Sequence, residues 1–256
     1  MKQIILATTN QEEENKTTPH FISVVAHRLR TQLSIIKWAL GMLSSCEDRL
    51  TVEQLDLLQK SAAANELMIR LIDDLIEVAR IEEGRMNYIF EKTDLAALLE
   101  NLCKSFEAQA IAKGLYFTFH KPGSLVQLTL DSDRISIALR NIIENAVLYT
   151  FKGGVNVRIE QNVTGVRIIV SDTGIGVPNH QISQLFSQFF RGDNVLRLQI
   201  DGTGLGLFIA RSIIKSHGGD ITVSSKENDG TIVTISLPID PNRIPRAEVP
   251  IEEIVS

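Results

Sequence analysis

Two long segments near the start of the chain carry apolar residues at alternating spacings of four and three. In the first segment the series is Ile22, Ala26, Leu29, Leu33, Ile36, Leu40 and Leu43. In the second it is Leu55, Leu58, Ala62, Asn65, Ile69, Ile72, Ile76 and Ala79. This spacing is typical of the seam of an α-helix that packs lengthwise against other helices. A polar break over 44–51 joins the segments, and Gly84 ends the second helix. The spacing therefore predicts a long helical hairpin over residues 19–86.

Both helices also carry apolar residues outside the seam, such as Leu57, Leu71, Leu75 and Val78. A single hairpin cannot cover that much apolar surface, whereas two hairpins packed as a four-helix bundle can. We therefore expect a homodimer formed through the hairpin. Asn65 lies on the seam, where it is either a polar residue that sets the register or a tolerated exposed Asn.

The rest of the chain has shorter helical patterns mixed with strands. Helices are expected over 94–113, 133–150 and 205–217, and strands over 115–119, 125–130, 155–161, 166–171, 220–225 and 231–237. Because antiparallel hairpins occur among these strands, the pattern predicts an α+β protein whose second domain, residues 87–240, is an α/β sandwich. We expect the polar residues 1–18 and the Pro-rich residues 241–256 to be a flexible leader and tail.

The charge and the cysteines narrow the function classes. The net charge of −5 and the lack of a Lys/Arg run argue against nucleic acid as a partner. Cys46 and Cys103 have no metal-ligand spacing and favour a reducing compartment, with a disulfide as the alternative.

No stretch approaches the ~20 apolar residues that span a bilayer. The opening MKQIILA is too short for a signal peptide. We expect a soluble, cytoplasmic chain without membrane contact, and leave open a membrane segment upstream.

Four ordered segments in the second half are the most specific signal. They are Asn141–Ala146 on a predicted helix, Asp172–Gly176 after a predicted strand, Phe186–Arg191, and Gly202–Leu207. Each glycine cluster alone is a weak signal, because glycine-rich turns are common. The GxxxxGK[ST] phosphate loop is absent from the sequence. Together the four segments resemble the nucleotide-binding boxes of histidine kinases, which share a fold with gyrase-type and chaperone-type ATPases. The resemblance covers about residues 19–238.

This resemblance implies an ATP site with Mg²⁺. It assigns Asn145 as a ligand of Mg²⁺ through its amide oxygen, with Asn141 supporting the phosphates, and it adds Tyr149 to the nucleotide-binding residues. Asn141 and Asn145 are four residues apart and share one helix face. The alternative is that both are ordinary surface residues.

The other boxes complete the implied nucleotide site. Asp172 can accept a hydrogen bond from the adenine amino group, although Asp-Thr-Gly also makes a serviceable turn. Gly174 and Gly176 let the backbone pass close to the base. Arg191 is implied to contact a phosphate, with a solvated arginine as the alternative, and residues 191–201 fit a mobile lid. The amides before the last helix suit phosphate binding, and the residues there are Gly202, Thr203, Gly204, Leu205 and Gly206.

The segment from Phe21 to Leu33 resembles the phosphoacceptor box of the same family. The resemblance implies that His27 accepts the γ-phosphoryl group and passes it to an Asp of a response regulator receiver domain. A neutral imidazole nitrogen is a competent nucleophile near neutral pH. The alternative is a surface His. Thr31, four residues on, is implied to orient the water that dephosphorylates the regulator, or else it bonds the carbonyl of residue 27.

Three positions depart from the family pattern. Arg28 replaces the acidic residue that accepts the imidazole proton, Gln32 replaces a Pro, and Leu148 replaces a Lys or Arg. Since general-base assistance contributes ~10²–10⁴-fold in rate, we predict slow autophosphorylation. The leading hypothesis is an ATP-dependent protein-histidine kinase. The alternatives are a degenerate kinase that acts as an ATP-binding scaffold or phosphatase only, and a gyrase- or chaperone-like ATPase, which would leave the hairpin unexplained.

Overall fold

The structure, a computed structural model, describes residues 25–26, 28–45, 50–123, 125–198 and 202–245. The chain divides into two compact units, and each is considered by itself. The first comprises Met1–Asn87 with Leu198–Ile209, and the second comprises Tyr88–Arg197 with Ala210–Ser256. His27 lies outside the described residues, as do the predicted leader, most of the predicted tail and Cys46.

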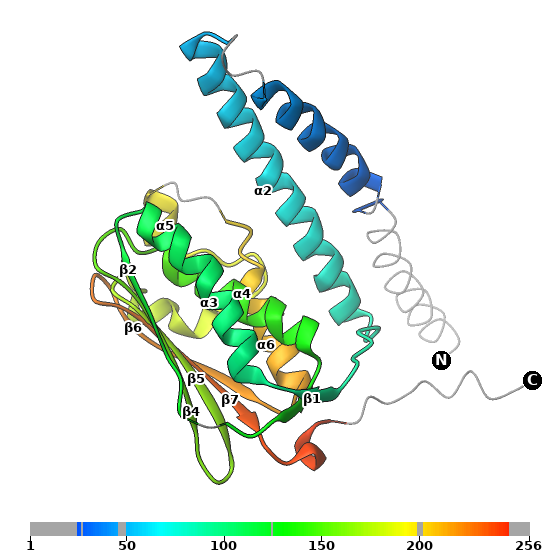
Figure 1. The fold of residues 1–256 in the computed structure, drawn as a ribbon, viewed down its shortest axis with the longest axis vertical. Helices are drawn as coiled ribbons and strands as arrows, with labels where there is room; N and C mark the ends of the chain where they lie inside the picture. Colours follow the sequence, from blue (N-terminus) through cyan, green and yellow to red (C-terminus); the bar gives the residue numbers. More distant parts are fainter. Residues whose placement is uncertain (1–24, 27, 46–49, 124, 199–201, 246–256) are drawn as a thin grey trace, which may run out of the picture. The chain divides into compact units, whose positions relative to one another are not determined.

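The first unit contains the predicted helical hairpin, drawn in blue and cyan in Figure 1. Residues 28–44 form one uninterrupted helix, and α2 (Val52–Glu82) is the second. The hydroxyl of Thr51 accepts a hydrogen bond from the Gln54 amide at 3.2 Å, while the Gln54 side chain accepts one from the Thr51 amide at 2.9 Å. This reciprocal capping box starts α2. Gly84 follows the helix with a φ of 63°, which confirms the predicted end.

Two ion pairs and one buried amide join the helices of the hairpin. Arg30 pairs with Asp73 at 3.1 Å and Lys37 pairs with Glu66 at 2.7 Å. Asn65 is only 2% exposed, and its side-chain nitrogen donates to the Leu33 carbonyl at 3.2 Å. The alternative of an exposed, tolerated Asn65 is therefore wrong, because this residue ties α2 to the first helix.

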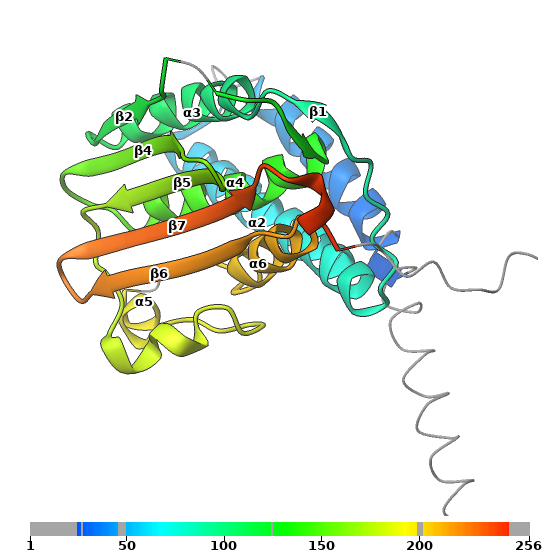
Figure 2. The ribbon, with the colours of Figure 1, turned by 90° about the horizontal axis from the view of Figure 1, so that it is seen from below.

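The second unit is built on a five-stranded sheet of order β2-β4-β5-β7-β6. Only β2 and β4 run parallel, and the remaining neighbours are antiparallel. Helices lie on one face of the sheet, as Figures 1 and 2 show. The strands are β2 (Tyr116–His120), β4 (Gly154–Gln161), β5 (Gly165–Asp172), β6 (Asp220–Lys226) and β7 (Gly230–Pro238). The helices are α3 (Leu95–Ala112), α4 (Ser132–Leu148) and α6 (Gly206–Ser216), whose first residues belong to the other unit. The predicted mixed helix-and-sheet architecture is confirmed.

The core of this unit is formed by every second residue of its strands and by one face of its helices. Alternate strand residues such as Val157 and Ile168 are fully buried, because successive side chains of a strand point to opposite faces. Leu139 and Ile143 of α4 lie four residues apart and are also fully buried. The other face of the sheet carries polar and charged side chains, such as Arg158, which pairs with Glu160 at 3.0 Å.

A buried histidine fixes the start of α4. His217 is 1% exposed, and its Nε2 accepts a hydrogen bond from the Asp131 amide at 3.1 Å. Its Nδ1 lies 2.8 Å from the Ile213 carbonyl and donates to it in this tautomer. The Asp131 carboxylate in turn caps α4 by accepting from the Arg134 amide at 3.0 Å. Burial lowers the pKa of His217, so the neutral ring serves as a fixed acceptor.

Several short elements were not predicted from the sequence. Strand β1 (Glu91–Thr93) pairs with β3 (Leu128–Leu130), which is shorter than the predicted strand over 125–130. Thr93 ends β1, and the next residue, Asp94, caps α3. The 3₁₀ helix η2 (Asn179–Gln184) and helix α5 (Asp193–Arg197) also lacked a periodic signal. Three to six residues are too few for a period to appear.

Within the described residues, no helix has the combination of length and apolar character that crossing a membrane requires.

Candidate functional site

The end of α4 is bonded to the loop that follows β5. Asn141, Asn145 and Tyr149 succeed one another at intervals of four along α4, with Tyr149 as its C-terminal cap. The carbonyl of Tyr149 accepts a hydrogen bond from the Ile175 amide at 3.2 Å. Two of the segments singled out in the sequence are therefore neighbours in space.

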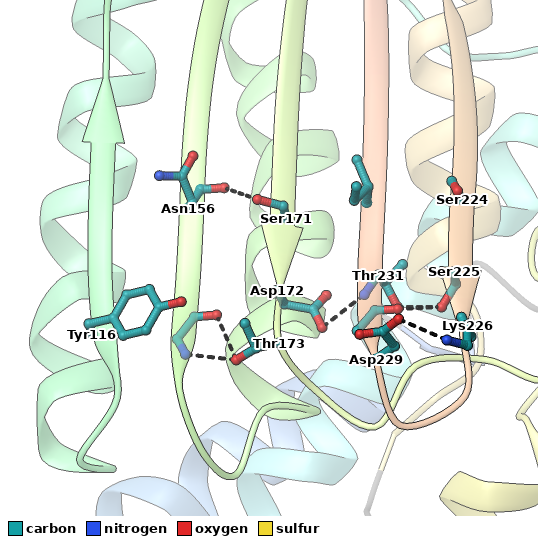
Figure 3. A pocket seen from close by; sticks show the side chains of 13 residues that line it. Tyr116, Asn156, Ser171, Asp172, Thr173, Ser224, Ser225, Lys226, Asp229 and Thr231 are labelled. Carbon is teal, nitrogen blue, oxygen red and sulfur yellow. Dashed lines mark hydrogen bonds and ion pairs between the residues drawn. The ribbon is translucent and has the colours of Figure 1, made fainter.

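Asp172 is the last residue of β5 and is partly buried beside that loop. One carboxylate oxygen, Oδ1, accepts from the Gly174 amide at 2.8 Å and from the Thr231 amide at 3.2 Å. Figure 3 shows the side chain directed toward Thr231 on β7. Burial raises the pKa of Asp172 to about 6, although these two backbone donors act in the opposite direction. The carboxylate is thus ionised near neutral pH but poorly solvated, which makes it a strong hydrogen-bond acceptor.

The glycines of the loop allow close backbone contacts. A Cβ on Gly174 would lie 2.5 Å from the Tyr149 carbonyl oxygen. Gly176 has a φ of 60°, and a Cβ there would lie 1.9 Å from the Lys226 carbonyl oxygen. Any side chain at these positions would push the loop away from α4 and from the β6–β7 hairpin. The glycines therefore hold the backbone of this loop in place.

Three residues that the sequence did not point to also fix this loop. Asn194 of α5 donates its side-chain amide to the Gly176 carbonyl at 2.8 Å. The Asn228 amide donates to the Ile175 carbonyl at 2.8 Å, and the Ser225 hydroxyl accepts from the Val177 amide at 2.9 Å. They lie far from the loop in the sequence and share no spacing with it. Only the folded chain reveals them.

A shallow hollow of about 330 Å³ lies beside Asp172. Its lining includes the ring of Tyr116, the amide of Asn156 and the hydroxyl of Ser171, all labelled in Figure 3. The Asn156 amide donates to Thr118 at 2.7 Å, and Ser171 donates to the Asn156 carbonyl at 3.4 Å. The Asn156 and Ser171 side chains therefore already have partners within the protein.

The α4 residues fit a phosphate and metal site. The amide nitrogen Nδ2 of Asn141 is buried and has no hydrogen-bond partner among the described residues. A buried donor of this kind requires an acceptor, such as a phosphate oxygen. Asn145 is half-buried one turn further along. Burial raises the pKa of Tyr149 while the positive charge of Arg191 lowers it, so the half-buried Arg191 lies near this end of α4.

The last glycine segment belongs to the first unit, whereas the site residues described above belong to the second. Thr203 accepts a hydrogen bond at its hydroxyl from the Leu205 amide at 3.1 Å, and Gly204 has a φ of 70°. Leu205 is buried, and its carbonyl accepts from the Ile209 amide at 3.0 Å. Helix α6 then begins at Gly206, one residue after the predicted start. Gly202 precedes this turn and is half-buried.

Two of the residues expected to act in phosphotransfer, Arg28 and Thr31, lie on the first helix. Arg28 and Thr31 are exposed, and Gln32 lies within the uninterrupted helix. Leu148 is half-buried at the end of α4. His27 itself is outside the described residues.

Two family models match the chain. The model of the His Kinase A (phospho-acceptor) domain matches residues 20–84. The model of the histidine kinase-, DNA gyrase B-, and HSP90-like ATPase matches residues 130–241.

Curated relatives match this chain over a fraction of their own length. The chain is 32% identical over 234 residues to the sensor protein SrrB of Staphylococcus aureus, covering 90% of this chain and 40% of SrrB. It is 29% identical over 240 residues to the sensor histidine kinase WalK of Bacillus subtilis, covering 92% of this chain and 39% of WalK. The chain thus spans about two fifths of the length of these relatives.

Solved structures of histidine kinases share the fold. Full-length ShkA in complex with AMPPNP matches with a TM-score of 0.70 and 25% identity, over 87% of this chain and 47% of ShkA. The Acinetobacter baumannii histidine kinase AdeS matches with a TM-score of 0.59 and 24% identity, over 84% of this chain and 98% of AdeS. A phospho-acceptor hairpin followed by a nucleotide-binding α/β domain is thus present in this chain, which belongs to the two-component sensor histidine kinases as their catalytic core.

Proposed function

We propose that the chain transfers the γ-phosphoryl group of Mg·ATP to His27 and then to an Asp of a response regulator receiver domain. The observation that carries this proposal is the hydrogen bond between the Tyr149 carbonyl and the Ile175 amide. It sets the asparagine face of α4 beside the loop of Asp172. One nucleotide could therefore contact Asp172 with its base and the α4 asparagines with its phosphates.

Asp172 selects the base. Its carboxylate accepts a hydrogen bond from the exocyclic amino group of adenine, whereas the carbonyl of guanine at that position would be repelled. The raised pKa, about 6, reflects a carboxylate that lacks full solvation before the base arrives. The amino group of adenine donates a hydrogen bond that replaces part of the missing solvation of this carboxylate.

The α4 asparagines and nearby groups hold the phosphates. Asn145 offers an amide oxygen to Mg²⁺, which when bound neutralises charge on the transferring phosphoryl group. The buried amide nitrogen of Asn141 donates to a phosphate oxygen and so gains the partner that it lacks. Arg191 adds a positive charge, and the amides of Gly202–Gly206 complete the phosphate contacts.

The imidazole of His27 attacks the γ-phosphorus in line. A nitrogen–phosphorus bond forms, the bond from phosphorus to the ADP oxygen breaks, and the second imidazole nitrogen gives up its proton. Arg28 follows the acceptor and is exposed, and a guanidinium cannot accept that proton. The proton therefore passes to solvent, which is why we expect slow autophosphorylation.

Opposite faces of the first helix serve two partners. Leu29, Ile36 and Leu43, on the seam side, are 46%, 45% and 53% exposed in the single chain, and a second copy of the hairpin covers them. Trp38 lies on the other side and is 67% exposed. Thr31 shares this outer face, and the receiver domain docks there beside His27. Two further apolar residues extend this outer face, Ile35 and Met42.

The first experiment measures acid-labile phosphate incorporated from γ-labelled Mg·ATP. His27→Ala should abolish the label and Asn145→Ala should reduce it at least about a hundredfold. His120→Ala, an exposed histidine on β2, is the matched control and should label like the wild type. Undiminished label in His27→Ala would contradict the proposal, and steady hydrolysis independent of His27 would favour an ATPase.

The exposed Arg28 favours one second candidate, a scaffold or phosphatase that binds ATP without forming phosphohistidine. Arg28→Glu distinguishes the two. Restoring a proton acceptor should accelerate labelling of His27 by about tenfold or more. An unlabelled wild type that binds ATP, and stays unlabelled after this change, would leave the second candidate.

A further inference from the structure

One hydrogen bond links the glycine segment to the hairpin inside the first unit. The hydroxyl of Thr203 donates to a carboxylate oxygen of Asp74 on α2 at 2.6 Å, a short distance for such a bond. The two residues are separated by 129 positions in the sequence. No motif in the sequence connects them, and the mechanism proposed above makes no use of Asp74.

Within the first unit, the bond ties the turn that precedes α6 to α2. The same Thr203 hydroxyl accepts from the Leu205 amide at 3.1 Å, in the residue that precedes Gly206, the first residue of α6. Asp74 lies nine residues after Asn65, which rotates it about 180° around α2 from the buried seam. The neighbouring Asp73 points elsewhere, because it pairs with Arg30 of the first helix at 3.1 Å.

The carboxylate of Asp74 is bonded in the turn that precedes the N-terminus of α6. The N-terminus of a helix carries a partial positive charge and favours anions. Asp74 brings a negative charge to the turn just before α6 and takes up the Thr203 hydroxyl. A triphosphate bound by the same segment would compete for that hydroxyl and would be repelled by the carboxylate.

We infer that Asp74 is a positioning residue that holds the glycine segment on the hairpin and competes with the phosphates of ATP for it. The inference rests on the phosphate-binding role proposed for residues 202–206. Its consequence is a reciprocal coupling: whatever loosens the contact with α2 tightens nucleotide binding, and bound nucleotide releases the segment from α2. The hairpin that carries the acceptor thereby senses whether the nucleotide is present.

The test is calorimetric titration of the full chain with Mg·AMPPNP and with adenosine. Asp74→Ala should tighten AMPPNP binding about three- to tenfold, the range for losing one partly exposed bond to a charged group. Adenosine, which has no phosphates, should bind equally to both proteins. Asp73→Ala removes the same charge one residue away and should leave both affinities within about twofold.

Hydrogen exchange gives a second readout that folding defects do not imitate. Amides in the peptide over residues 202–209 should exchange differently in Asp74→Ala and in the wild type without nucleotide, and alike once AMPPNP saturates both. If Asp74→Ala melts at a lower temperature, Asp74→Asn, which keeps the shape and removes only the charge, takes its place.

Three results separate the possible failures. Unchanged or weaker AMPPNP binding in Asp74→Ala, with wild-type binding intact, would overturn the inference and leave the proposed function standing. Equal tightening by Asp73→Ala would reduce the effect to general charge and would also overturn it. If Asn145→Ala binds AMPPNP as tightly as the wild type, the proposed nucleotide site itself is wrong.

Discussion

The two units of this chain complete their cores in different ways. In the α/β unit, large apolar side chains such as Leu139 and Ile168 are fully enclosed by the unit itself. In the hairpin, Leu57 remains 63% exposed and Ile36 remains 45% exposed. Because burial of apolar surface drives folding and association alike, we expect the α/β unit to be stable alone and the hairpin to require a second copy.

The largest effect should come from the enclosed core. Leu139→Ala removes a fully buried side chain from α4 and should lower the free energy of unfolding by about 2–5 kcal/mol. The free energy of unfolding of the α/β unit is measured by denaturant titration at several protein concentrations. A loss that varies with concentration would contradict the view that this unit completes its own core.

Asp172→Asn should show where the α/β unit gives up stability for binding. Folding raises the pKa of this carboxyl from 3.8 to about 6, so the folded state holds its proton more tightly and loses stability as the pH rises through that window. The neutral amide avoids this loss and should stabilise the unit by about 1–3 kcal/mol near neutral pH. The gain should vanish at about pH 4, below which both forms are neutral.

The same variant should bind AMPPNP at least about tenfold more weakly, because an amide cannot serve as the same charged acceptor. Denaturant unfolding near neutral pH and at about pH 4 measures the change in stability. Titration with AMPPNP measures the change in affinity. Equal stability of wild type and variant near neutral pH would show that the carboxylate is not poorly solvated.

Ile36→Ala tests the open side of the hairpin. Ile36 is 45% exposed in the single chain. Removing its side chain should therefore weaken the association of two hairpins by about 1–2 kcal/mol and leave the single hairpin little changed. The melting temperature of the hairpin should therefore become more dependent on protein concentration, and sedimentation should show a weaker dimer. Ala39→Ser, an exposed position on the same helix, is the control. Unchanged association would place the dimer contact elsewhere.

The smallest effect concerns His217. Its pKa is lowered by burial, so the unfolded state binds a proton first as the pH falls below its ordinary value of 6.5. Stability should be complete above pH 6.5 and should decline below it, by at most about 1.4 kcal/mol per pH unit. Comparing wild type with His217→Gln over this range cancels the contribution of Asp172. An unaltered slope in His217→Gln would refute the view that burial of His217 causes this loss of stability.

The regular elements could be predicted because their signals are local. The seam from Leu29 to Leu43 and the alternation in residues 166–171 repeat at helical and strand periods, and each element is long enough to show its period. Strand β1 and helix α5 were missed because so few residues carry no period. The domain boundaries at 19–86 and 87–240 stay a prediction, as do the roles of the site residues.

What the sequence determined by itself is the kind of elements, their order and the residues that resemble a nucleotide site. Only the tertiary structure decided which residues distant in sequence form hydrogen bonds. These bonds are Tyr149 to Ile175, Asn194 to Gly176, and Thr203 to Asp74. The physical reason is range. Periodicity and capping arise among residues a turn apart, whereas a hydrogen bond across 129 positions depends on how whole elements pack, which no local pattern records.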